Sequence, residues 1–176
     1  LLMTKIYPII PARGGSKGLK NKNLIDLYGK PLIYWSIEYA QRIQLLESCI
    51  VSTDSNKIAQ VSKKFGALVP FIRNESLATD KAKTSDVILD VILNCNLNED
   101  DIILLLEPTS PFRYLKNFND IREVFFQNRL RKIVSIQEAI SSSYKFQFFK
   151  NNDSSLVPIE KSEIPNDIRR QDIKQT

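Results

Sequence analysis

The sequence predicts a three-layer α/β fold, in which helices cover both faces of a mainly parallel sheet. Segments with the pattern of buried strands alternate along the chain with helical segments of about ten residues or more. The 176 residues, 43% of them hydrophobic, suffice for one core that needs neither disulfides nor a structural metal. No apolar run approaches the ~20 residues that span a bilayer. The composition therefore excludes disordered, fibrous and membrane-spanning proteins.

The first predicted strand covers residues 5–10, an apolar and β-rich run that ends at Pro11. It opens into the glycine-containing segment 14–18, which has the composition of a flexible loop. A helix is expected next, over residues 31–44. Pro31 suits its first helical position, and apolar residues recur at helical spacing on one side.

A second buried strand at residues 48–53 leads into a second helix. We expect Asp54 or Ser55 to cap the start of this helix, since both are favoured N-cap residues. Gly66 is expected to stop it just after Phe65. The chain therefore begins with a βαβα unit.

The same alternation continues to the end of the predicted sheet. The further elements are a strand at 67–71, a helix at 84–95, a strand at 102–106, a helix at 115–128 and a strand at 133–137. Because residues 102–106 are the most hydrophobic of these, we expect them to form the central strand. Ligands of parallel sheets bind beyond the carboxyl ends of the strands. The loops 11–23, 53–56 and 107–113 are therefore the candidate site.

The C-terminal part of the chain differs in composition. Residues 141–176 are polar and hold no strong strand or helix with which to close a domain. We expect a nucleotide-binding α/β domain over residues 1–138 and the start of a dimerisation or substrate arm over residues 139–176. We also expect the chain to be truncated at its C-terminus, as part of a longer protein.

The sequence contains no histidine. A Ser-His or Cys-His nucleophile pair, a histidine-bound zinc and an imidazole base are therefore excluded. Cys49 and Cys95 both have apolar neighbours and are expected to be reduced core residues. Since the first residues also lack the apolar region of a signal peptide, we expect a cytoplasmic protein with no membrane partner.

The net charge of +5 is concentrated at the N-terminus. Residues 1–35 hold six positive side chains and one negative one, so the rest of the chain holds nineteen of each sign. A basic excess confined to one segment favours a small polyanion, such as a nucleoside triphosphate, over a nucleic acid. The alternative is a solvated lysine-rich loop.

The first loop resembles two phosphate-binding motifs without matching either. Leu19 and Lys20 follow Gly18, where a Walker A loop needs lysine and then serine or threonine. Arg13 stands where a dinucleotide fingerprint has its first glycine. Even so, glycines let backbone N–H groups approach an anion, and Arg13 and Lys17 would neutralise it. We predict a triphosphate cradle; the alternative is a glycine turn with two solvated cations.

A longer motif surrounds this loop. It reads Ile10-Pro11-Ala12-Arg13-Gly14-Gly15-Ser16-Lys17-Gly18-Leu19, followed by Lys22-Asn23-Leu24. It resembles the N-terminal signature of the acylneuraminate cytidylyltransferases, which make CMP-sialic acid and related CMP-nonulosonates from CTP. Three further blocks resemble that family in order and spacing. They are Ser52-Thr53-Asp54 for its S-T-D, residues 73–85 for its R-x-x-x-L-x-x-D segment, and residues 107–113 for its Q-P-T-S-P-L-R.

The resemblance covers about residues 5–138 and implies roles for individual side chains. Arg13 and Lys17 would be the catalytic cations. The triphosphate would meet Arg13, Gly14, Ser16 and Lys17, and the nucleotide would meet Asn23 and Ser85. The nucleotide or acyl-sugar pocket would hold Glu107, Thr109, Ser110 and Arg113, and the arm would bring Lys145, Arg170 and Gln171 to the sugar carboxylate. The same resemblance implies Mg²⁺ as cofactor and a homodimer.

Several of these residues also have purely structural explanations. Thr109 and Ser110 could satisfy backbone groups at the end of a strand. Arg113 could be a solvated charge, and Asp54 could be an N-cap or a ligand. Lys145 could equally be a surface cation, as could Arg170.

The sequence departs from the family at two points. Glu107 stands where many members have glutamine, which adds a negative charge beside the expected sugar pocket. The family's paired aspartates that hold Mg²⁺ have no counterpart in this chain, so its metal ligands are unidentified.

The implied reaction is attack of the anomeric hydroxyl of a nonulosonic acid on the α-phosphorus of CTP, which expels pyrophosphate. Cations would stabilise the developing charge without a covalent enzyme intermediate. One alternative is CMP-Kdo or another sugar nucleotide as product, although Lys22-Asn23-Leu24 favours the nonulosonate branch. Another is a CTP-binding fragment without turnover. The cradle also predicts that the loop is not packed inward with Arg13 tied up by the protein's own acids.

Overall fold

The computed structural model describes residues 4–16, 18–44, 46–130, 132–134, 148–150 and 156–158. The chain divides into two compact units, residues 1–129 and residues 130–176. The predicted boundary after residue 138 lies outside the described residues and stays a prediction.

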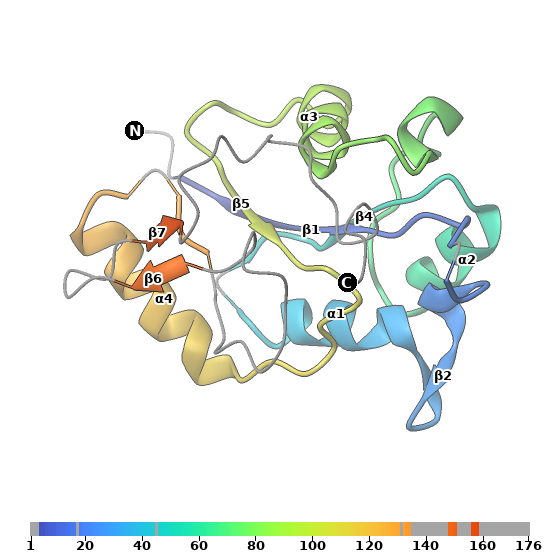
Figure 1. The fold of residues 1–176 in the computed structure, drawn as a ribbon, viewed down its shortest axis with the longest axis horizontal. Helices are drawn as coiled ribbons and strands as arrows, with labels where there is room; N and C mark the ends of the chain where they lie inside the picture. The colour runs from blue at the N-terminus through green and yellow to red at the C-terminus, as the bar shows by residue number, and fades with distance from the viewer. Residues whose placement is uncertain are drawn as a thin grey trace. The chain divides into compact units, whose positions relative to one another are not determined.

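The sheet of the first unit has three parallel strands in the order β4 (Ile50–Ser52), β1 (Ile6–Pro11), β5 (Ile102–Leu105) (Figure 1). The predicted parallel sheet is therefore confirmed. The expectation that residues 102–106 form the central strand is wrong for the described sheet, where β1 lies between the other two. Burial gives the physical reason: Ile9 and Ile10 of β1 are fully buried, whereas Leu105 of β5 is 41% exposed.

Alternate residues of β1 supply the cores on the two faces of the sheet. Ile6 and Ile10 belong to a cluster with residues of α1 (Leu32–Gln41), α2 (Asn56–Lys64) and α4 (Leu115–Gln127). Ile9 belongs to a second cluster with Val91 of α3 (Thr84–Asn94), which lies on the opposite face (Figure 1). The three layers predicted from the sequence are confirmed.

The first residues of α2 and α1 can be compared with the prediction. The hydroxyl of Ser55 accepts a hydrogen bond from the Ile58 N–H at 3.4 Å, so Ser55 caps α2 and leaves Asp54 available for another contact. The expectation that Pro31 is the first residue of α1 is wrong. Pro31 is the N-cap of that helix and ends β3 (Lys30–Pro31), which pairs with β2 (Asp26–Leu27).

The predicted third strand at residues 67–71 is wrong. Only Leu68 joins the sheet, by an isolated bridge to Ile50. Pro70 offers no N–H with which to continue a ladder. The chain then passes through the 3-10 helix η2 (Glu75–Ala78) to α3.

The second unit contributes a strand pair, β6 (Phe148–Lys150) and β7 (Leu156–Pro158), which is antiparallel. Of the strand predicted at 133–137, residues 133 and 134 are not in a strand, and the rest lies outside the described residues. None of the helices in the described ranges is both long and apolar enough to cross a bilayer.

Candidate functional site

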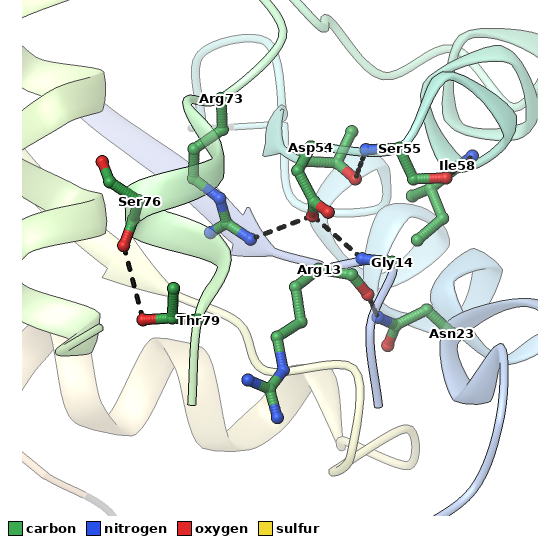
Figure 2. Close-up of polar contacts among 10 residues, drawn as sticks. Arg13, Gly14, Asn23, Asp54, Ser55, Ile58, Arg73, Ser76 and Thr79 are labelled. Carbon is green, nitrogen blue, oxygen red and sulfur yellow. Dashed lines mark hydrogen bonds and ion pairs between the residues drawn. The ribbon is translucent and has the colours of Figure 1, made fainter. Parts of the chain in front are cut away.

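Two loops meet where the parallel strands β1 and β4 end. The Ala12 N–H donates to the Ser52 carbonyl at 2.9 Å, which extends the pairing of these strands by one step. The next contact is made by a side chain: the Gly14 N–H donates to Asp54 Oδ1 at 2.9 Å (Figure 2). A Cβ atom on Gly14 would lie 3.0 Å from the Cβ of Ser55. The loops therefore approach each other at a distance that only glycine fits without a shift.

A buried arginine lies behind this contact. Arg73 is 3% exposed, and its Nη2 lies 3.6 Å from Asp54 Oδ1, the oxygen that also accepts from Gly14 (Figure 2). Its backbone N–H donates to the Thr53 carbonyl at 2.9 Å. Burial lowers the pKa of the Arg73 guanidinium, and the Asp54 carboxylate opposes this shift. Because arginine starts from so high a pKa, the group stays charged at neutral pH and pairs with the carboxylate.

Asn23 holds the other side of the first loop. It lies in the 3-10 helix η1 (Lys22–Leu24) and is 5% exposed. Its Nδ2 donates to the Arg13 carbonyl at 3.0 Å (Figure 2). The structure thus shows Asn23 supporting the backbone of the loop, and its contact with a nucleotide stays a prediction.

A pocket of about 310 Å³ opens beside the loop. It is lined by Arg13, Gly15, Ser16, Ala78, Thr79 and Asp80. The loop is not packed inward, since Gly15 is exposed. The arginine is nevertheless paired: Arg13 Nη2 lies 2.7 Å from Asp80 Oδ1. The expectation that no acid of the protein engages this arginine is therefore wrong, because the loop after η2 brings a carboxylate to it.

The loop after β5 is braced against α1. Arg113 Nη1 donates to the fully buried Ser36 Oγ at 3.0 Å, and its Nη2 donates to the Glu107 carbonyl at 2.6 Å. The guanidinium also lies over the ring of Tyr39, 5.7 Å from its centre. Burial lowers the pKa of Arg113, and Tyr39 and Glu107 oppose this shift. Arg113 is therefore a brace between loop and helix, and its contact with a sugar stays a prediction.

The other predicted residues lie apart from the pocket or outside the described residues. Ser85 is exposed in the first turn of α3, where its hydroxyl lies 3.4 Å from Asp86 Oδ1. The side chains of Glu107, Thr109 and Ser110 are exposed at the end of β5. Four of the predicted site residues lie outside the described ranges: Lys17, Lys145, Arg170 and Gln171.

The sequence predicts no individual contact for Arg73 or Asp80, which belong to a motif, and it leaves two roles open for Asp54. Position is the signal that the sequence offers: Asp54 directly follows the strand predicted at residues 48–53, and Arg73 and Asp80 lie on either side of η2. Which carboxylate pairs with which arginine is set by the fold.

The described residues do not form a magnesium site of their own. No group of three or more cysteine, aspartate or glutamate side chains converges among them. Asp54 and Asp80 are each engaged with an arginine. We therefore assign no metal ligand from the part of the chain that the structure describes.

Comparison with known proteins adds three findings. A family model described as "Cytidylyltransferase" matches residues 8–157. The chain is 44% identical over 111 residues to CMP-N,N'-diacetyllegionaminic acid synthase of Legionella pneumophila, covering 62% of this chain and 48% of that protein. It is 43% identical over 112 residues to N-acylneuraminate cytidylyltransferase of Escherichia coli, covering 64% of this chain and 26% of that protein. The chain thus spans about half or less of the length of these relatives.

A solved structure is also similar to this chain. It is that of CMP:2-keto-3-deoxy-manno-octonic acid synthetase complexed with CTP, with a TM-score of 0.61 and 25% identity. The similarity covers 72% of this chain and 49% of that one.

Proposed function

Because the chain belongs to the cytidylyltransferase family, we propose that it binds CTP and transfers CMP to the anomeric hydroxyl of a nonulosonic acid, with release of pyrophosphate. The observation that carries the proposal is the loop at the end of β1. Gly14 is held there by Asp54, and Arg13 and Ser16 line the adjacent pocket. Because the Gly14 N–H is engaged by Asp54, the groups left for an anion are the N–H groups that follow Gly14, the Ser16 hydroxyl and the Arg13 guanidinium.

In the proposed reaction the loop holds the triphosphate for in-line attack on the α-phosphorus. Arg13 and Lys17 would stabilise the charge that develops on the phosphate oxygens, and Ser16 would donate a hydrogen bond. No covalent intermediate on the enzyme is needed, which suits a chain without histidine. Mg²⁺ belongs to the proposal as the usual partner of the phosphates, without a ligand assigned from this chain.

The pair of Arg13 and Asp80 sets a condition on this proposal. Both side chains are partly exposed, at 30% and 24%, so the pair contributes about 1 kcal/mol or less. A triphosphate offers the same guanidinium several charged oxygens in a bidentate geometry. We therefore propose that Arg13 exchanges the carboxylate of Asp80 for phosphate when CTP binds.

The acceptor is proposed from the relatives. Two of them are named for nonulosonic acids, N,N'-diacetyllegionaminic acid and N-acylneuraminate. The solved structure is named for 2-keto-3-deoxy-manno-octonic acid, which supports CMP-Kdo synthesis as the second candidate. Against it, Lys22-Asn23-Leu24 resembles the nonulosonate branch. In either case we propose that residues 107–113 contact the acceptor. Contacts of Lys145, Arg170 and Gln171 with the sugar carboxylate stay predictions from the family resemblance, as does a cytoplasmic homodimer.

The test incubates the chain with CTP, Mg²⁺ and one of three acceptors, N-acetylneuraminate, N,N'-diacetyllegionaminate or Kdo, and measures pyrophosphate release. Release with a nine-carbon acid supports the first candidate, and release with Kdo alone supports the second. CTP binding in a calorimeter without release with any acceptor supports a binding fragment. If the chain neither binds CTP nor releases pyrophosphate with any acceptor, the proposed function is contradicted.

Two variants test the residues of the loop. Arg13→Ala and Lys17→Ala should each reduce pyrophosphate release by at least about tenfold, which is ~1.4 kcal/mol of transition-state stabilisation. Arg42→Ala is the matched control, because this exposed arginine is the C-cap of α1 and pairs on the surface with Glu38. Unchanged pyrophosphate release in both loop variants would refute the triphosphate cradle.

A further inference from the structure

The peptide bond between Arg13 and Gly14 is held at both of its polar groups. Its carbonyl, on Arg13, accepts from Asn23 Nδ2 at 3.0 Å, and its N–H, on Gly14, donates to Asp54 Oδ1 at 2.9 Å (Figure 2). A peptide unit is planar, so fixing its C=O and its N–H fixes the orientation of the whole plane. The Arg13 side chain starts at one end of that plane, and the pocket-lining residues Gly15 and Ser16 follow the other end.

The residues that hold the plane are tied to the core. Asn23 is buried, and Asp54 follows the buried residue Thr53 at the end of β4. Asp54 in turn faces Arg73, which is buried and bound through its backbone N–H to the Thr53 carbonyl. The orientation of the loop is therefore set from the sheet, through side chains that do not line the pocket.

The arrangement has an electrostatic cost that the arginine offsets. A carboxylate beside an anion-binding loop repels the anion, and Asp54 lies directly against Gly14. The buried guanidinium of Arg73 lies on the same carboxylate oxygen and compensates its charge. Asp90 of α3 also stabilises the charged form of Arg73. With the carboxylate neutralised in this way, it serves as an acceptor for Gly14 while adding little negative potential at the pocket.

We propose that Asn23, Asp54 and Arg73 form a clamp that positions the phosphate-binding loop, with Asp54 orienting the Gly14 N–H and Arg73 holding and neutralising Asp54. The three are positioning residues, since they act through the backbone of the loop. The inference rests on the proposed function for the identity of the ligand. Its geometric part, that Asp54 orients the peptide plane, applies to any polyphosphate that the loop binds.

The decisive comparison is between two variants with the same charge. Asp54→Asn and Asp54→Leu both remove the carboxylate charge, but only asparagine keeps an oxygen that can accept from Gly14. Inorganic tripolyphosphate, CTP and cytidine are titrated calorimetrically into each variant and into the unaltered chain. The Asn variant should bind tripolyphosphate and CTP about tenfold more tightly than the Leu variant, the loss expected when a partly buried hydrogen-bonding group loses its partner. Cytidine, which has no phosphates, should bind the two alike.

Two further variants extend the comparison. Arg73→Lys keeps the positive charge and Arg73→Met removes it, so the Lys variant should bind tripolyphosphate several-fold more tightly. Asp100→Asn is the control for the loss of an acidic residue, because Asp100 is exposed in the turn before β5, at the opposite end of that strand from the site. It should bind all three ligands as the unaltered chain does.

The outcomes separate this inference from the proposed function. If the unaltered chain binds CTP and the two Asp54 variants bind it equally, the clamp is refuted and the function stands. If the chain binds tripolyphosphate but not CTP, the cytidylyl function fails while the variants still decide the clamp. If the chain binds neither tripolyphosphate nor CTP, both the clamp and the proposed function are refuted. Equal losses of cytidine and CTP affinity in the Asp54→Leu variant refute a positioning role.

A second measurement covers the case in which Asp54→Leu does not fold. Amide hydrogen exchange at Gly14 is then measured in the unaltered chain and in Asp54→Asn. A slowly exchanging Gly14 N–H in both supports the clamp, since asparagine keeps the acceptor. An N–H that exchanges as fast as that of the exposed Gly15 in the unaltered chain overturns it.

Discussion

Substituting Gly14 by alanine should destabilise the protein, whereas the same change at Gly15 should not. The added Cβ at Gly14 would lie 3.0 Å from the Ser55 Cβ and 3.4 Å from Asp54 Oδ2. Carbon atoms pack best at ~3.5–4.0 Å, so either the loop or the cap of α2 must shift. Overpacking of this kind costs ~1–3 kcal/mol. Alanine recovers ~0.4–1 kcal/mol of this by restricting the unfolded chain.

At the middle of these ranges the net loss for Gly14→Ala is ~1.3 kcal/mol, a fall in Tm of about 3–5 °C for a domain of this size. At Gly15 a Cβ meets nothing within 4 Å, and the φ angle is not in the left-handed region. Gly15→Ala should accordingly keep or raise the Tm by up to ~4 °C. Thermal unfolding followed by circular dichroism compares the two. Equal melting temperatures, or a more stable Gly14→Ala, would refute the close approach of the loops.

Three other perturbations follow from the contacts of single side chains. Asp80→Asn should tighten CTP binding by about 1.4- to fivefold, because it releases Arg13 from a partly exposed pair worth ~0.2–1 kcal/mol; weaker binding in calorimetry would contradict the exchange of partners. Ser36→Ala should lower the free energy of unfolding in urea by ~1–2 kcal/mol, since Arg113 loses a buried acceptor. An unchanged urea midpoint would show that this hydrogen bond does not stabilise the fold. Burial raises the pKa of Cys49 from 9.0 to about 12, so its contribution to stability is complete below pH 9 and is lost as the pH rises towards 12. Relative to Cys49→Ala, the unaltered chain should lose up to ~1.4 kcal/mol per pH unit in that window, and parallel pH profiles would contradict this.

Local patterns were enough to predict most elements of the fold. The start of α2 shows why: a capping serine and Gly66, which has a φ of 84°, lie at its two ends and act on their immediate neighbours. Strand order is different, because it depends on which strands pair across the whole chain. Residues 102–106 are the most hydrophobic strand by composition, yet β1 takes the middle of the described sheet.

The candidate site was predictable in part for the same reason. The glycine loop could be found from its composition and its place after a strand. The contact of Gly14 with Asp54 joins residues 40 positions apart, and no sequence pattern specifies it. The pairing of Arg13 with Asp80 and the inward brace made by Arg113 likewise depend on how the loops fold back on the sheet.

A crystal structure of the chain with CTP would show where the triphosphate binds. We expect it in the pocket beside Gly15 and Ser16, with Arg13 turned from Asp80 to the phosphate oxygens and the Gly14 N–H still on Asp54. A triphosphate bound at another loop, with Arg13 still paired to Asp80, would contradict this expectation.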